Sequence, residues 1–359
     1  MGRLTNSIRR RRGLMGVDIS ATRVKLLELD RTGDEFRVLA YASEAVPEGA
    51  IRNFQILDAE AVARATLRAL ERSGSRTRDA AIAVSGPSVI SKTILMPASL
   101  DDAEMEQQIH FDAEHHIPHP IEEVNLDFQV LEPDPDNAQF NRVLLVACRR
   151  DNIEMRTAAI EMAHMRVQLV DVEEYALQNA CTLLLSRIEG VSDADSVAVF
   201  DIGSDTTRLT IQRQGRSLYA REIGFGGAAL DAALMERYET PDVDALRAQL
   251  RSGRISAPDI AENVREFAER LAVHIDRTLT FYQSASSGGD EPIDHVVLVG
   301  ASTLYPGLHD ALAQLLPWPV SLGNPLGGML ASAAARRNHV DSDAPSLMVA
   351  AGLALRGAV

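Results

Sequence analysis

The sequence predicts an α/β protein of two related halves, because one strand–turn–strand pattern occurs twice, far apart in the chain. The first copy is LMGVDISATRVK at residues 14–25, and the second is VAVFDIGSDTTRL at residues 197–209. In each copy a short apolar strand runs into an aspartate, then into small and hydroxyl residues, and then into a second strand. The two aspartates, Asp18 and Asp201, lie 201 − 18 = 183 positions apart, so the turns indicate two halves that close on one site.

The residues of both turns favour the binding of an anion. An aspartate where a buried strand meets a tight turn is costly unless it has a function. The side chains that follow are short, so backbone N–H groups can approach a phosphate closely. Asp18 and Asp201 would hold the Mg²⁺ that accompanies the phosphates, directly or through water. The predicted phosphate-binding residues are Asp18, Ser20, Ala21 and Thr22 in the first turn, and Gly203, Ser204, Asp205 and Thr206 in the second.

The chain before residue 190 reads as alternating strands and helices. Apolar alternation and β-branched residues indicate strands, and Ala, Leu and Val at helical spacing indicate helices. Acidic residues in the first turn of the segment 101–116 suit the N-terminal end of a helix dipole. The expected strands are 14–19, 24–29, 36–45, 80–84, 89–96, 124–131, 141–147 and 167–170, and the expected helices are 56–72, 101–116, 151–164 and 172–188.

The second half is expected to begin after a crossing at residues 189–195. Gly226 and Gly227 open a helix, residues 247–258 form a polar connector, and 261–284 form one long helix. A third motif follows at residues 295–307, HVVLVGASTLYPG, where a buried strand ends in a turn of small residues. Each motif alone is typical of an ordinary strand-ending turn. The three motifs in this order and at these intervals favour a nucleotide site.

This order resembles the actin-like ATPase superfamily, which includes actin, sugar kinases and bacterial filament proteins. In that superfamily the first two motifs bind phosphate and the third contacts adenosine. Within it, the chain resembles the PilM family of type IV pilus assembly, whose nearest relative is FtsA, from residue 13 or so to the end. The matching segments are 14–29, Met96-Pro97, IPHPIEEVNLDF at 117–128, ACRR at 147–150, VDVEEYAL at 170–177, Gly226-Gly227, 343–345 and 352–356.

The resemblance implies an actin-like two-domain fold of two ribonuclease-H-like halves with an inserted FtsA-type subdomain 1C. This insert interrupts the order of strands and helices that is expected for actin itself. The implied domains are a basic tail 1–12, subdomain 1A at 13–88, 1C at 89–167, 1A again at 168–190, 2A at 191–227, 2B at 228–289, 2A again at 290–335, and a C-terminal helix returning to 1A at 336–359.

The resemblance also assigns roles to single residues. Lys25 would neutralise phosphate, although a strand residue there can equally face solvent. Gly226, Gly227, Gly300, Ala301 and Ser302 would line the adenosine, and Ala301 adds a methyl group where the family usually has a second glycine. Glu174 would orient the attacking water, or it would stabilise the start of its helix instead. ATP hydrolysis is expected to be slow or absent, because no other acid, glutamine or arginine is evidently aimed at the γ-phosphate.

Composition limits the classes of partner. A net charge of −15 argues against a nucleic-acid surface, and the hydrophobic and charged fractions of 46% and 24% are ordinary for a soluble globular protein. No apolar run reaches the 18 residues that a membrane-spanning helix needs. Cys148 and Cys181 are isolated thiols that suit a reducing compartment. The arginine-rich tail 1–12 would touch anionic lipid or remain solvated.

The resemblance implies an ATP- and Mg²⁺-binding cytoplasmic scaffold, peripheral at the inner membrane. It would bind the N-terminal cytoplasmic tail of PilN, and through PilN connect to PilO, the pilus motor ATPases and the platform protein. The partner groove is expected at the 1A/1C boundary, where the insert offers strand edges. Two alternatives are an FtsA-like cell-division tether, which ends in an amphipathic membrane helix, and a sugar-kinase-type phosphotransferase, which needs a catalytic aspartate between the halves.

Overall fold

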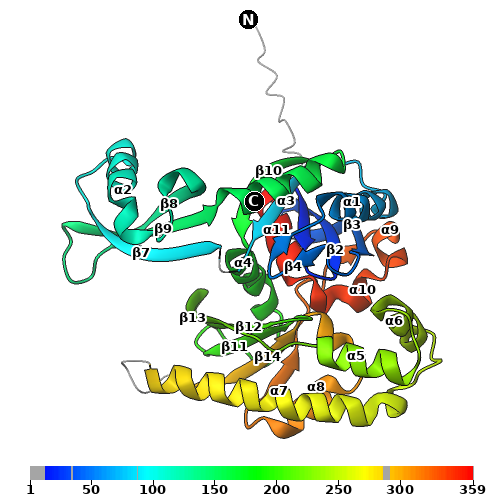
Figure 1. The fold of residues 1–359 in the computed structure, drawn as a ribbon. Coiled ribbons are helices and arrows are strands. Elements are labelled where there is room, and N and C mark those ends of the chain that lie inside the picture. The colour runs from blue at the N-terminus through cyan, green and yellow to red at the C-terminus, as the bar shows by residue number, and fades with distance from the viewer. Residues whose placement is uncertain (1–12, 34, 87, 286–291, 359) are drawn as a thin grey trace, which may run out of the picture.

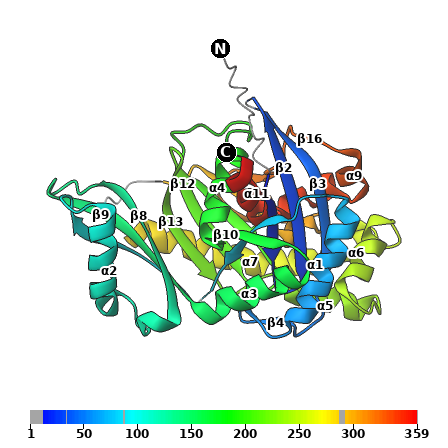
Figure 2. The same ribbon diagram turned by 90° about the horizontal axis from the view of Figure 1, so that it is seen from above.

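The computed structural model describes residues 13–33, 35–86, 88–285 and 292–358, so the predicted basic tail 1–12 lies outside the described residues. Two large sheets form the body of the protein, and a third, smaller sheet projects from it (Figures 1 and 2). The predicted two-half α/β architecture is confirmed by these sheets. Within the described ranges, no helix combines the length and apolar character needed to cross a membrane.

The first sheet has six strands in the order β10-β6-β1-β2-β3-β16. β1, β2 and β3 form an antiparallel meander, and β6 and β10 add parallel strands. Side chains alternate between its faces, so Leu26 packs with α1 (Ala59–Ser73) while Leu27 packs with α4 (Glu173–Leu185) and α11 (Met348–Ala358). The strands are β1 (Met15–Ile19), β2 (Arg23–Thr32), β3 (Glu35–Ala45), β6 (Asp79–Val84), β10 (Arg166–Val172) and β16 (Leu330–Ala331), and a small hairpin β4 (Ile51–Arg52) and β5 (Gln55–Ile56) lies beside them.

The second sheet has five strands in the order β13-β12-β11-β14-β15 and repeats the start of the first. In both sheets an antiparallel hairpin is followed by a parallel strand, β6 beside β1 and β14 beside β11. α4 and α11 lie between the two sheets, because Leu27 of β2 and Val199 of β11 belong to one buried cluster with them. The strands are β11 (Val197–Ile202), β12 (Thr207–Arg213), β13 (Arg216–Ile223), β14 (His295–Val299) and β15 (Val320–Leu322).

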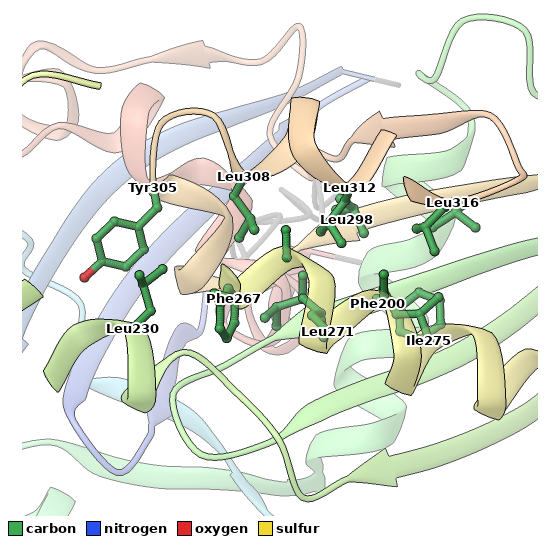
Figure 3. Packing of buried hydrophobic residues seen from close by; sticks show 14 of the residues in the cluster. Phe200, Leu230, Phe267, Leu271, Ile275, Leu298, Tyr305, Leu308, Leu312 and Leu316 are labelled. Carbon is green, nitrogen blue, oxygen red and sulfur yellow. The ribbon is translucent and has the colours of Figure 1, made fainter. Parts of the chain in front are cut away.

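The other face of the second sheet is covered by the long helix α7 (Ala257–Ala285). Figure 3 shows Phe267, Leu271 and Ile275 of this helix packed near Phe200 and Leu298 of the sheet. The remaining helices of this half are α5 (Ala228–Arg237), α6 (Val243–Arg251), the 3-10 turn η2 (Ala301–Leu304) and α8 (Leu308–Leu315).

The predicted polar connector 247–258 is wrong in its first and last residues. α6 continues to Arg251, and α7 already begins at Ala257. Asp242 caps α6 by accepting a hydrogen bond from the Ala245 N–H at 2.7 Å. Leu246 and Leu250 then lie one turn apart and pack on the core, so one narrow apolar stripe is sufficient for a short helix that carries two arginines between and beyond these leucines.

The insert is a three-stranded sheet with its own core. Its strand order is β7-β9-β8, and α2 (Asp102–His116) contributes Met105 and Ile109 to a cluster with Ile94 and Leu145. A short turn η1 (Ile121–Glu123) precedes β8. The strands are β7 (Val89–Pro97), β8 (Val124–Pro133) and β9 (Phe140–Arg149).

Two predicted domain limits differ from the structure. α3 (Arg150–Met162) was predicted inside the insert 89–167, but its Ala159 and Ile160 are buried with residues of the first sheet. The compact insert therefore ends with β9. The chain also returns to the first sheet at β16, which pairs with β3, before the predicted limit at residue 336. From β16 it continues through α9 (Ala333–Arg337), α10 (Val340–Asp343) and the turn η3 (Ala344–Ser346) to α11.

Two glycines allow α11 to sit close to its neighbours. A Cβ at Gly352 would overlap the carbonyl oxygen of Ala176 in α4, and a Cβ at Gly16 would overlap that of Ala350. We expect Gly352→Ala to lower the free energy of unfolding by about 1–3 kcal/mol or more, because overpacked cores must shift backbone. Urea denaturation of Gly224→Ala is the control, since no atom of the described residues lies within 4 Å of that Cβ position. Equal stability of the two variants would contradict the close approach.

Candidate functional site

Each of the two predicted turns carries an aspartate opposite a basic side chain. The register of β1 and β2 pairs Asp18 with Lys25, and that of β11 and β12 pairs Asp201 with Arg208. Lys25 Nζ donates to Asp18 Oδ2 at 3.1 Å, and Arg208 Nη1 lies 3.6 Å from Asp201 Oδ2. The repeat therefore includes a cation as well as a carboxylate, in both cases seven positions after the aspartate.

The two turns are closed in the same way. The Ser20 N–H donates to the Arg23 carbonyl oxygen, and the Gly203 N–H donates to the Thr206 carbonyl oxygen, both at 2.9 Å. These bonds occupy the N–H groups of Ser20 and Gly203, which were predicted as phosphate donors. The predicted phosphate donors that these two closing bonds leave unused include the N–H groups at the tips of the turns, Ala21-Thr22 and Ser204-Asp205.

The predicted glycine pair and the third motif meet at the second turn. The Gly227 N–H and the Ser302 hydroxyl both donate to the Gly203 carbonyl oxygen, at 2.9 and 2.8 Å. A Cβ at Gly226 would overlap the Ser204 carbonyl oxygen, so this contact requires glycine. The structure therefore brings together three motifs that are widely separated in the sequence.

Gly300 sets the distance between the third motif and the metal-binding candidate Asp201. Its φ of +98° favours glycine, and an added Cβ would lie 2.5 Å from Asp201 Oδ1. The Gly300 N–H donates to the Pro345 carbonyl oxygen at 2.7 Å, which links this turn to η3. Ala301 begins η2 and is half-buried.

A charged cluster surrounds Asp201. Arg208 lies 2.8 Å from Glu173 Oε1 and 3.6 Å from Glu222 Oε2, in addition to its contact with Asp201. Burial raises the pKa of Asp201, while Arg208 and Lys25 oppose this shift. A bound cation would favour the ionised carboxylate further.

The residues present fit a magnesium ion. Asp18 and Asp201 supply carboxylate oxygens beside both phosphate turns, and Mg²⁺ commonly keeps several waters and takes only one or two carboxylates. In the part of the chain that the structure describes, no three His, Cys, Asp or Glu side chains gather as a complete metal cage. A water-rich metal held together with phosphate suits this arrangement.

Glu173, which the sequence did not single out, is the acid of α4 that reaches the cluster. The predicted residue, Glu174, instead accepts a hydrogen bond from Gln178 Nε2 at 3.3 Å, and burial raises its pKa. The start of α4 has no side-chain cap, so Glu174 does not cap it by a hydrogen bond. Arg208 was also missed, although its spacing from Asp201 matches that of Lys25 from Asp18.

A small cationic pocket lies next to Lys25. It measures about 50 Å³ and is lined by five basic side chains together with Asp244, Leu304 and others. The five cations are Arg23, Lys25, Arg72, Arg247 and Arg251. Arg23 of β2 forms an ion pair with Asp244 of α6, which joins the two halves across the pocket. A chain with net charge −15 therefore gathers positive charge where the halves meet.

Comparison with known proteins agrees with this architecture. The family model of type IV pilus assembly protein PilM matches residues 16–358. A solved PilM-PilN type IV pilus biogenesis complex superposes with a TM-score of 0.75 at 24% identity, covering 97% of this chain and 99% of that chain. The ethanolamine utilization protein EutJ from Carboxydothermus hydrogenoformans gives a TM-score of 0.53 at 15% identity, covering 96% and 89%. These likenesses confirm the predicted actin-like α/β fold.

Cell division protein FtsA is a more distant relative. FtsA from Rhizobium meliloti is 25% identical over 240 residues, which are 59% of this chain and 53% of that protein. FtsA from Agrobacterium fabrum is 24% identical over 206 residues, 51% of this chain and 45% of that protein. The chain thus spans about half the length of these curated relatives, whereas the pilus family covers almost all of it. The chain belongs to the PilM family of type IV pilus assembly proteins.

Proposed function

We propose that this protein binds ATP with Mg²⁺ between its two halves and, as a scaffold of type IV pilus assembly, captures the N-terminal cytoplasmic tail of PilN. The observation that carries the proposal is the repeated pair of turns, each with an aspartate opposite a cation and a tip of small residues. Two equivalent turns from opposite halves suit a chain of phosphates lying between them.

Different residues of the chain would donate hydrogen bonds to the phosphates and neutralise their charge. The tips Ala21-Thr22 and Ser204-Asp205 would donate N–H groups to phosphate, and Lys25 would neutralise charge. Mg²⁺, when bound, would offset further phosphate charge beside Asp18 and Asp201. Arg23, Arg247 and Arg251 surround the adjoining pocket, so its charge favours an anion entering between the halves.

The insert supplies a surface that suits a basic partner segment. Residues 89–149 contain three basic and twelve acidic residues, a net charge of 3 − 12 = −9 within a chain of −15. In the order β7-β9-β8 both β7 and β8 are edge strands, and an extended peptide can add to such an edge. Exposed acids would draw a basic juxtamembrane tail and make binding salt-dependent. Exposed acids of the insert that could do so are Asp101, Asp102, Glu104, Glu122 and Glu123.

Binding of the PilN tail would also determine where in the cell the protein lies. The superposed complex contains PilN, and the tail of PilN would hold the protein peripherally at the cytoplasmic face of the inner membrane. Through PilN the scaffold would reach PilO, the platform protein and the pilus motor ATPases.

Fluorescence anisotropy with the N-terminal cytoplasmic segment of the PilN from the same genome tests the proposal. We expect the labelled peptide to bind the full chain, with affinity that falls as salt rises. Isothermal titration of the same chain with Mg-ATP should show one site. Absence of both binding events would overturn the proposed function.

Hydrolysis by the isolated chain should be slow or absent. Glu173 and Arg208 of the cluster around Asp201 could orient water or stabilise charge, but they are paired with one another at 2.8 Å. Phosphate release should therefore stay well below the roughly 1–100 s⁻¹ of dedicated kinases. A rate within that range would show that this pair separates when nucleotide binds.

A further inference from the structure

Arg156 of α3 is a buried cation beside the first phosphate turn that none of the assigned roles uses. Its side chain is almost completely enclosed, with 2% exposure. Its three hydrogen bonds in the described part of the chain all go to uncharged acceptors: Asn152 Oδ1 at 3.0 Å, the Phe54 carbonyl oxygen at 2.9 Å and the Ile19 carbonyl oxygen at 3.5 Å. A buried guanidinium without a hydrogen-bonded carboxylate is costly, so a further role is expected.

One of these hydrogen bonds, from Arg156 to the Ile19 carbonyl oxygen, reaches the proposed nucleotide site. Ile19 is the last residue of β1 and stands between Asp18 and Ser20. Burial lowers the pKa of Arg156, while Glu173 and Asp18 act electrostatically to raise it. Arg156 therefore holds the backbone of the first turn and lies within the field of Asp18, which would hold the metal, and of Glu173.

The hydrogen bond from Arg156 to Asn152 leads to the base of the insert. Asn152 Nδ2 donates to Ser88 Oγ at 2.5 Å. The Ser88 carbonyl oxygen accepts from the Arg149 N–H at 3.2 Å, which joins the two chain segments that enter and leave the insert. Three side chains thus connect the phosphate turn with the point from which β7 and β9 project.

We propose that Arg156, through Asn152 and Ser88, is a positioning residue that couples the first phosphate turn to the insert. This inference rests on the proposed function, because it links the nucleotide site with the PilN groove. Phosphate drawn to the tip of the turn moves the Ile19 carbonyl group, and the planar guanidinium transmits this movement to Asn152. Ser88 then shifts the base of β7 and β9. The coupling is reciprocal, so peptide binding changes nucleotide affinity by the same factor.

The test measures the ratio of peptide dissociation constants without and with saturating Mg-ATP. For the full-length wild-type chain we expect a ratio in the range of about 5–150-fold, typical of allosteric coupling. Ser88→Ala and Asn152→Ala break the relay without touching the phosphate turn, so each should bring the ratio close to one while both separate affinities remain measurable.

Arg156→Lys keeps the charge but loses the planar fork of donors, so it should retain Mg-ATP binding and lose the coupling. Ser91→Ala is the matched control, because the Ser91 hydroxyl contacts Tyr175 Oη at the same junction but outside the relay. It should retain the wild-type ratio.

The outcomes separate the two proposals. Wild-type binding of both ligands with a ratio of one, or full coupling in Ser88→Ala and Asn152→Ala, overturns the relay and leaves the proposed function standing. A wild-type chain that binds neither ligand removes the proposed function and the relay with it.

Discussion

Replacing Asp201 with asparagine should abolish most of the stabilisation that Mg-ATP gives to the wild-type protein, while the fold survives. Ligand at 100 times its Kd adds about 2.7 kcal/mol to the free energy of unfolding, and the asparagine variant should lose nearly all of it. Burial raises the pKa of Asp201, so the folded chain disfavours this charge and tolerates a neutral isostere. Arg208 keeps its contacts with Glu173 and Glu222.

Thermal unfolding with and without Mg-ATP measures this effect. Asp171→Asn is the matched control, because Asp171 is also a buried strand-end aspartate whose pKa is raised by burial, but its partner is Arg356. It should keep the full ligand-induced shift. An undiminished shift in Asp201→Asn would mean that the carboxylate has no part in holding metal or phosphate.

The parts of the site that sequence could predict are those set by local pattern. A strand that ends in aspartate and small residues is ordinary when it occurs once, but its recurrence favours a pair of anion-binding turns. The turns at Asp18 and Asp201 could therefore be identified from the sequence. The pairing of Asp201 with Arg208 depends on strand register. Its only signal in the sequence is the seven-residue spacing shared with Lys25, and an arginine on a strand is ordinarily interpreted as a solvent-facing residue.

Helix orientation explains why Glu173, and not Glu174, contacts Arg208. Adjacent residues on a helix point about 100° apart, so the choice between Glu173 and Glu174 decides which acid reaches Arg208. The sequence predicts a helix there but does not fix its rotation, which depends on packing between the two sheets. The same reason applies to α3: the sequence predicts a helix there, and only the structure shows that its buried Ala159 and Ile160 cover the first sheet rather than the insert.

The insert should be removable without loss of the nucleotide site. Residues 88 and 149 are joined by a backbone hydrogen bond of 3.2 Å between the Ser88 carbonyl oxygen and the Arg149 N–H, so a short glycine-serine linker can replace 89–148 with little strain. The insert also has a separate core, in which Met105 and Leu145 pack with other insert residues and not with the large sheets. The deletion variant should therefore unfold cooperatively and retain Mg-ATP binding.

The same deletion should abolish binding of the PilN tail, because it removes the edges of β7 and β8 and, over residues 89–148, two basic and twelve acidic residues, a net charge of 2 − 12 = −10. Fluorescence anisotropy of the labelled peptide measures the loss. A milder variant, Glu122→Gln with Glu123→Gln, keeps the strands and should weaken binding mainly at low salt, where exposed charges act over the longest distance. If the folded deletion variant keeps wild-type peptide affinity, the tail binds the two large halves, and the acidic insert must recognise another partner.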